Sequence, residues 1–166
     1  MNLTEVQKEF HPSSKVWIYT SSTIFSKDVE TQIQKTMDDF CVGWTAHNKE
    51  LKAAACIVES RFIILCVDEH LNPATGCSID KSVRILQEIE DQHNLNLFDR
   101  MLFTYKDKQG NTLTCSKIVF EEPIASGEIS EDTIVYNTLC NTMEMLNSSW
   151  TIPLKDSWMA SYFNLV

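Results

Sequence analysis

The stretch ELKAAACIVESRFIILCVDE, residues 50–69, contains two apolar runs separated by a short polar break. Runs of this length and composition are typical of β-strands that are buried in a sheet. The break near Glu59–Arg61 is too short to hold a crossover helix, so residues 50–60 and 61–69 are predicted to pair as an antiparallel hairpin. The second strand is apolar on both faces, which predicts that it lies in the centre of the sheet.

On the N-terminal side of this hairpin, KVWIYT at residues 15–20 predicts another buried strand. A helix is expected to start at Ser26 and to end near Gly43, because apolar residues recur every three or four positions between them. Residues 1–14 are expected to form a loosely ordered lead-in. The apolar stripe of the helix consists of Val29, Ile33, Met37, Phe40 and Trp44.

On the C-terminal side, the pattern predicts a second amphipathic helix over residues 79–93 with a left-handed stop at Asn94. A second hairpin is expected to follow, with strands over 98–106 and 112–120. A strand over 133–137 and a helix over 142–149, capped by Asn141, come next. A last helix is expected to pack Trp158 and Phe163. This order predicts one α+β domain over residues 1–166. We expect a mixed, mostly antiparallel sheet of about five strands, with helices mainly on one face.

The charge balance limits the partners of the protein. The net charge is −9, the acidic residues are spread along the chain, and no run of lysines and arginines is present. A nucleic-acid partner is therefore not expected, because binding a phosphate backbone requires a clustered basic face. No membrane partner is expected either, since the apolar runs are far shorter than the ~20 residues that cross a bilayer.

The six cysteines, at positions 41, 56, 66, 77, 115 and 140, include no pair with the spacing of a zinc ribbon or a redox dithiol. Several of them lie inside apolar strands, where a free thiol acts as a small hydrophobic side chain. The N-terminal residues contain no apolar signal core. These observations predict a cytoplasmic protein with free thiols and without a metal or another cofactor.

Several stretches resemble a family of small bacterial proteins of unknown biochemical function that automated annotation often describes as ABC transporter ATPases. They are VWIY, WTAHNKELKA, RFIILCVDE, ATGCSID, LFDRM, TIVYNTL and PLKDSW, and they cover nearly the whole chain. An ATPase P-loop needs two glycines around four residues, followed by lysine, but none of the glycines here precedes a lysine. In the family a histidine usually follows SW, whereas this chain has Met159.

The loop NPATGCSID, residues 72–80, offers the most concentrated set of polar groups. In one interpretation it only starts a helix: Ser78 or Asp80 caps the free N–H groups, and Gly76 supplies a positive φ. In the other, the same N–H groups bind a ligand, with help from the hydroxyls of Thr75 and Ser78. The Asp80 carboxylate competes with an anion there, so a neutral or amine-bearing ligand fits better.

Chemistry at this loop would depend on Cys77, because a thiol at a helix N-terminus has a stabilised thiolate. Its general base would be His47 or His70. The competing interpretation is a loop cysteine packed against the sheet.

Two further polar groups stand near strand ends. Side chains alternate between the faces of a strand, so Asp68 and His70 are expected on the same face. They could form part of a metal site, act as an acid/base pair, or simply be solvated. Arg100 is a candidate contact for a carboxylate or phosphate, or a local partner of Asp99.

No complete catalytic set is visible in the sequence, so we expect a protein that binds a small polar ligand or a partner protein near the 72–80 loop. The site would form where residues 68–80 meet the segment around His47, with Asp68, Thr75, Gly76, Ser78, Asp80 and Arg100 as binding residues. The alternative is a cysteine-dependent enzyme that uses Cys77 with His47 or His70. A third possibility is a homodimer that acts through its apolar surface.

Overall fold

The computed structural model describes residues 1–70 and 72–162. The helices are α1 (Leu3–Glu9), α2 (Lys27–Gly43), α3 (Gly76–His93), α4 (Lys117–Ala125) and α5 (Met143–Ser149), with short 3-10 turns at Leu154–Asp156 and Trp158–Tyr162. The strands are β1 (Lys15–Thr20), β2 (Thr45–Ala46), β3 (Lys49–Glu50), β4 (Lys52–Val58), β5 (Phe62–Asp68), β6 (Leu102–Lys106), β7 (Thr112–Ser116), β8 (Ile134–Tyr136) and β9 (Thr151–Pro153). The α+β class with antiparallel sheets is confirmed.

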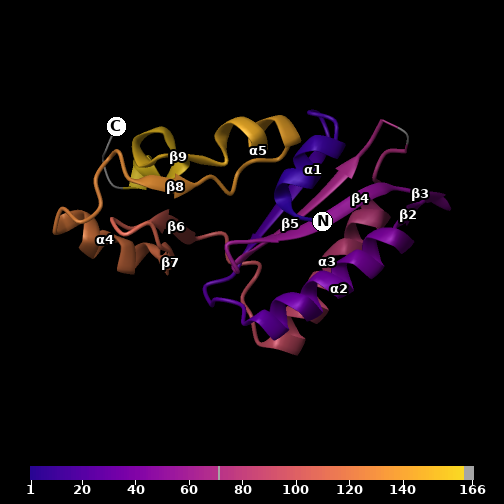
Figure 1. The fold of residues 1–166 in the computed structure, drawn as a ribbon, viewed down its shortest axis with the longest axis horizontal. Helices are drawn as coiled ribbons and strands as arrows, with labels where there is room; N and C mark the ends of the chain where they lie inside the picture. Colours follow the sequence, from indigo (N-terminus) through magenta and orange to yellow (C-terminus); the bar gives the residue numbers. More distant parts are fainter. Residues whose placement is uncertain (71, 163–166) are drawn as a thin grey trace.

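The predicted hairpin forms the centre of the fold. Strands β1, β5 and β4 make an antiparallel sheet in that order, so β5 is the central strand, as its two-sided apolar pattern predicted (Figure 1). All seven residues of β5 are buried. The turn between β4 and β5 contains Glu59 and Ser60, which both have positive φ, the geometry of a tight hairpin turn.

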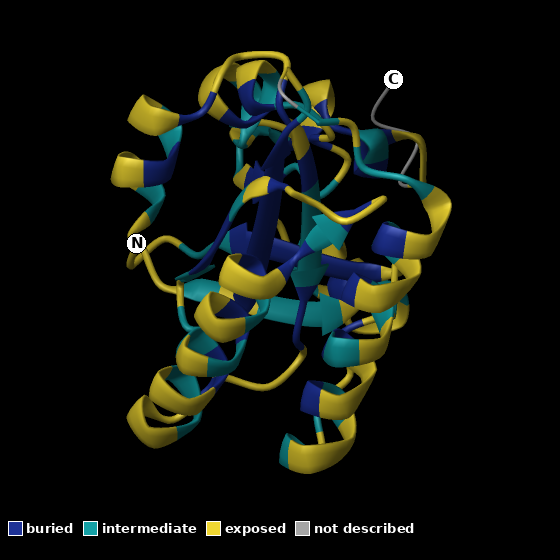
Figure 2. Ribbon diagram, turned by 90° about the vertical axis from the view of Figure 1, so that its right-hand side faces the viewer, coloured by how far each residue is buried: buried dark blue, intermediate teal, exposed yellow. Residues whose placement is uncertain are grey.

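Helices cover both faces of this sheet, so the expectation that they pack mainly on one face was wrong. Ile63, Leu65 and Val67 of β5 pack in one core with residues of α2 and α3. The alternate residues Phe62, Ile64 and Cys66 pack in a second core with residues of α1 and α5. A strand that is apolar on both faces requires such cover on both, and the buried strands lie between exposed helical surfaces in Figure 2.

The remaining strands do not join the central sheet, so the single sheet of about five strands was also wrong. Strands β7, β6, β8 and β9 form a separate antiparallel sheet in that order, and β2 and β3 form a short ribbon. The second sheet has its own core, which includes Phe103, Phe120 of α4 and the fully buried Met159. In the described chain, β6 pairs with β7 and β8, and β1 pairs with β5, so no strand pairing joins the two sheets.

The expected lead-in at residues 1–14 is instead the helix α1. The Asn2 side chain accepts the Glu5 N–H at 3.0 Å, and the Glu5 carboxylate accepts the Asn2 N–H at 2.8 Å. This reciprocal cap satisfies helix donors that would otherwise be free. Val6 and Phe10 are buried in the core beside β5, which holds the segment in place.

Other element boundaries differ in detail. The caps predicted at Ser26 and Asn94 are confirmed, but Thr142 rather than Asn141 caps α5. The strand expected over 112–120 ends at Ser116, where α4 begins. The last predicted helix consists of 3-10 turns that include Trp158, and Phe163 lies outside the described residues. Within the described ranges, no helix is long and apolar enough to cross a bilayer.

Candidate functional site

The 72–80 loop ends in the first turn of α3, where its polar groups mainly bond to each other. Ser78 Oγ accepts the Thr75 N–H at 2.8 Å and lies 2.8 Å from the Thr75 carbonyl oxygen, to which it donates. Thr75 is the N-cap residue, and Ser78 caps the helix start from inside the helix by accepting the Thr75 N–H, as expected. The cap expected at Asp80 was wrong, because Asp80 lies beyond the first turn of the helix. Gly76 is the first helical residue, and among the described glycines only Gly110 and Gly127 have positive φ.

Two hydrogen bonds hold this loop against the segment that follows α2. The Trp44 indole Nε1–H donates to the Ser78 carbonyl at 2.8 Å, and the Asn72 amide donates to the Glu50 carbonyl at 3.0 Å. A shallow pocket of about 580 Å³ lies at this junction, between Asn72 and residues 48–52. Cys77, His47 and Asp68 do not line it.

The structure does not join Cys77 to a general base among the residues that it describes. Cys77 is exposed on the first turn of α3. His47 is exposed in the turn between β2 and β3, where it and Asn48 have positive φ. The His70 ring instead contacts the Asp68 carboxylate at 2.9 Å and the His11 ring, with 4.0 Å between ring centroids. The nucleophilic role of Cys77 stays a prediction.

We expect iodoacetamide to label Cys77 first in the native protein. Cys41, Cys56, Cys66 and Cys140 are buried, and burial raises the pKa of the Cys41 and Cys56 thiols to about 12. Their thiolates are therefore scarce and inaccessible near neutral pH. Mass spectrometry of peptides after brief labelling checks this order, with a urea-unfolded sample as the control. Equal labelling of Cys77 and Cys56 in the native protein would contradict it.

Asp68, predicted as a binding residue, is held by protein groups at the end of β5. Its carboxylate lies 3.1 Å from Lys52 Nζ and also accepts the His70 backbone N–H at 3.1 Å. Burial favours the neutral acid, but the hydrogen bonds from His70 and Lys52 outweigh it and lower the pKa of Asp68 to about 2. Lys52 also donates to the Glu9 carbonyl at 2.8 Å, so this cluster ties α1 to the sheet.

The strongest candidate site is a groove of about 470 Å³ along the outer edge of β1, which we call the β1 groove. Its walls come from segments that are distant in the sequence: β1 itself, α3, residues 97–102 and residues 138–141. Its volume falls within the range of small-molecule sites. The lining residues are Val16, Trp17, Ile18, Tyr19, Thr20, Ile79, Val83, Leu97, Phe98, Asp99, Arg100, Leu102, Thr138, Leu139, Cys140 and Asn141.

Arg100 is the predicted binding residue that the structure places in this groove. It is exposed, and the structure gives it no ion pair with any described carboxylate. Its neighbour Asp99 accepts the Met101 N–H at 2.8 Å instead. Burial raises the pKa of Tyr19, and the positive charge of Arg100 opposes that shift. The Tyr19 ring packs edge-on against Phe98, with 5.5 Å between centroids.

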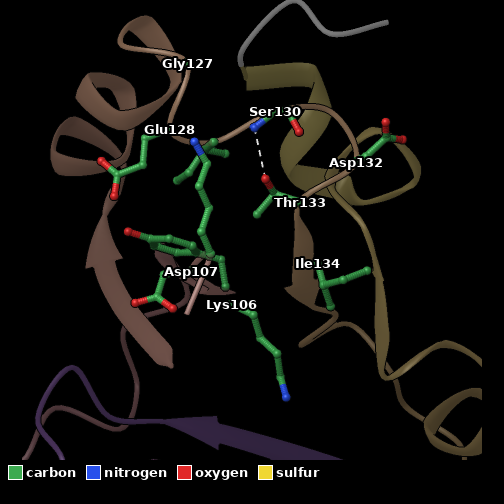
Figure 3. A pocket seen from close by; sticks show the side chains of 11 residues that line it. Lys106, Asp107, Gly127, Glu128, Ser130, Asp132, Thr133 and Ile134 are labelled. Carbon is green, nitrogen blue, oxygen red and sulfur yellow. Dashed lines mark hydrogen bonds between the residues drawn. The ribbon is translucent and has the colours of Figure 1, made fainter. Parts of the chain in front are cut away.

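The other hollows are lined mainly by charged and polar side chains. One of about 310 Å³ lies beside the second sheet, with Glu128 and Asp107 on one side and Thr133 and Ile134 on the other (Figure 3). The Thr133 hydroxyl there accepts the Ser130 N–H at 2.9 Å. Another, of about 760 Å³, follows the polar side of α2, and Ile57 is its one large apolar lining residue. No cluster of three metal-ligating side chains occurs in the part of the chain that the structure describes.

Most of the groove was missed by the sequence interpretation. KVWIYT, which contains Trp17 and Tyr19, is apolar on both faces and so predicted a buried strand, but β1 lies at the edge of its sheet. Leu139 and Phe98 lie in connecting segments, and both are at least partly exposed. The signal that the sequence did offer was Leu139, a large apolar residue between the predicted strand 133–137 and the predicted helix 142–149.

Comparison with known proteins gives no relative: no family model, curated protein or solved structure matches this chain.

Proposed function

We propose that this is a binding protein and that its ligand, a small polar molecule or a segment of a partner protein, occupies the β1 groove beside the start of α3. The observation that carries the proposal is a groove of ligand size that combines apolar walls with the unpaired guanidinium of Arg100. Such a guanidinium offers a planar pair of donors for a carboxylate or a phosphate. Apolar walls with few polar groups are the usual composition of a binding site.

A binding role is favoured over chemistry because several polar groups predicted at the 68–80 segment already have structural partners. Ser78 and Thr75 bond to each other, and Asp68 bonds to Lys52 and His70. Within the described residues, Cys77 has no hydrogen bond to a histidine ring. A nucleophile needs such a base within reach, although the distance is often longer before a substrate binds.

The test is a screen of small polar fragments by amide and indole chemical shifts. We expect hits that carry a carboxylate or phosphate to shift the Trp17 indole and the Tyr19 and Ile79 amide signals, since these residues line the groove. Val83→Arg should remove these shifts by filling the groove. The matched control, Val42→Arg, changes a residue of α2 that is 83% exposed and does not line the groove.

Two outcomes would count against the proposal. One is that no fragment shifts signals at the groove in the wild-type protein. The other is that hits bind Val83→Arg as well as they bind Val42→Arg while both variants melt at the wild-type temperature.

A further inference from the structure

We propose that the occupant of the β1 groove is an extended segment of a partner protein, which adds to β1 as a further strand and places a carboxylate on Arg100. This inference rests on the proposed function, because it names the partner of the same groove. Addition of a strand to an open sheet edge is an established mode of peptide recognition, in which main-chain hydrogen bonds give affinity and side-chain pockets give specificity.

The hydrogen bonds at the start of β1 show which backbone groups face the groove. The Val16 N–H donates to the Asn141 carbonyl at 3.0 Å, and the Met143 N–H donates to the Ser14 carbonyl at 2.9 Å. Ser14 and Val16 therefore direct their backbone groups away from β5. Because this direction alternates along a strand, the N–H and C=O of Ile18 point the same way.

Beyond that first bridge, the edge of β1 has no backbone partner among the described residues. Among the described strands β1 pairs only with β5, and the isolated bridge between Lys15 and Thr142 is the one backbone bridge on its outer side in the described chain. The Val16 C=O and both backbone groups of Ile18 are therefore open to an incoming strand. Residues 141–143 already make the first antiparallel step, and a bound segment would continue the same pairing along the groove.

Beyond Lys15, whose Nζ pairs with the Glu69 carboxylate at 3.0 Å, the sequence of this edge lacks the usual protection against pairing. Natural edge strands carry lysine, proline or a bulge, which prevent unwanted addition of another strand. Trp17, Ile18 and Tyr19 are uncharged, half-buried residues, and β1 pairs with β5 in an unbroken register. An open edge with large apolar side chains is a surface that a partner covers.

The shape and charge of the groove favour a single extended chain over a second copy of this protein. Ile79 and Val83 of α3 contribute lining on one side, and residues 138–141 contribute on another, so β1 lies recessed between them. Successive side chains of a bound strand would point alternately to these two walls. Asp99 and Arg100 are the only charged lining residues, and Arg100 lacks a partner within the described chain, so it selects an acidic side chain or a C-terminal carboxylate.

The probe for this inference is a phage-displayed library of random decapeptides, selected on the full-length protein. We expect enriched sequences to alternate β-branched or aromatic residues with others and to contain Asp, Glu or a free C-terminus. A synthetic peptide of the consensus should lose at least about tenfold in affinity for Arg100→Glu, which corresponds to about 1.4 kcal/mol. Arg84→Glu is the matched control, because Arg84 is exposed on α3 and does not line the groove.

N-methylation of the peptide, one amide at a time, separates strand addition from side-chain binding alone. Methyl groups on alternate amides should abolish binding, and those on the amides between them should leave it nearly unchanged, because only every second N–H faces β1. A uniform effect of methylation would overturn the inference. Light scattering on the peptide-free protein adds a second check: a dimer that Ile18→Lys dissociates would assign the edge to a second copy instead.

The failure of this inference is distinguishable from the failure of the proposed function. Fragments that bind the groove without any enriched peptide would leave the binding function standing and would overturn strand addition. The absence of both fragment and peptide binding would overturn both proposals.

Discussion

Replacing Phe62 by alanine is expected to lower the free energy of unfolding by about 3–5 kcal/mol. Phe62 begins β5, is 0% exposed, and lies in the core formed with α1 and α5. Its ring packs against Tyr136 and Trp150, with centroid distances of 5.1 Å and 4.9 Å. The truncation leaves a cavity among these rings, and the lost contacts add to the lost transfer free energy of the side chain. Urea denaturation followed by circular dichroism measures the change.

The control for this prediction is Val42→Ala on α2, where the side chain is 83% exposed. It should change the free energy of unfolding by no more than about 0.5 kcal/mol. A loss of less than about 1 kcal/mol for Phe62→Ala would contradict close packing of this face.

The second large effect is expected for Asp68→Asn, which should lower the free energy of unfolding by about 1.5–3 kcal/mol near neutral pH. The substitution removes the charge that bonds to Lys52 and His70 at the end of β5. The same change loosens the link from Lys52 to the Glu9 carbonyl of α1. Urea denaturation of both proteins under identical conditions measures the difference.

The stabilisation by Asp68 should depend on pH in a defined direction. Its pKa in the folded protein is about 2, below the ordinary value of 3.8, so its stabilising contribution is complete above the ordinary value. That contribution disappears as the pH falls through the folded-state pKa, and the gap between wild type and Asp68→Asn should close there. Asp91→Asn, which removes an exposed carboxylate on α3, should show no comparable closing gap. A gap that stays constant down to the folded-state pKa would contradict this assignment.

The elements that the sequence predicted well are those determined by local pattern. The β4–β5 hairpin follows from two adjacent apolar runs and a short break, and α2 and α3 follow from apolar residues at helical spacing. Ser26 at the start of α2 and Asn94 at the end of α3 were predicted correctly, because capping depends on neighbouring residues alone.

The partition of strands into separate sheets was not predictable in this way, since it depends on which distant segments meet. Strand β6 pairs with β8, about thirty residues further along the chain, and a pairing between such distant segments produces no periodic pattern in the sequence. The β1 groove has the same origin: Arg100 was identified from its chemistry, but Trp17, Val83 and Leu139 come together only in the folded chain. The 72–80 loop does lead into a helix, and its Thr75 and Ser78 groups bond to each other.

The two-sided cover of β5 has a consequence for synthesis on the ribosome. The face that carries Phe62, Ile64 and Cys66 is enclosed in part by Tyr136 and Met143, which are translated at least seventy residues later. A nascent chain that has emerged only through α3 can cover the opposite face with α2 and α3, but it covers this face only in part, with α1. Until the last helices leave the exit tunnel, this face therefore exposes apolar surface that favours aggregation of the polypeptide.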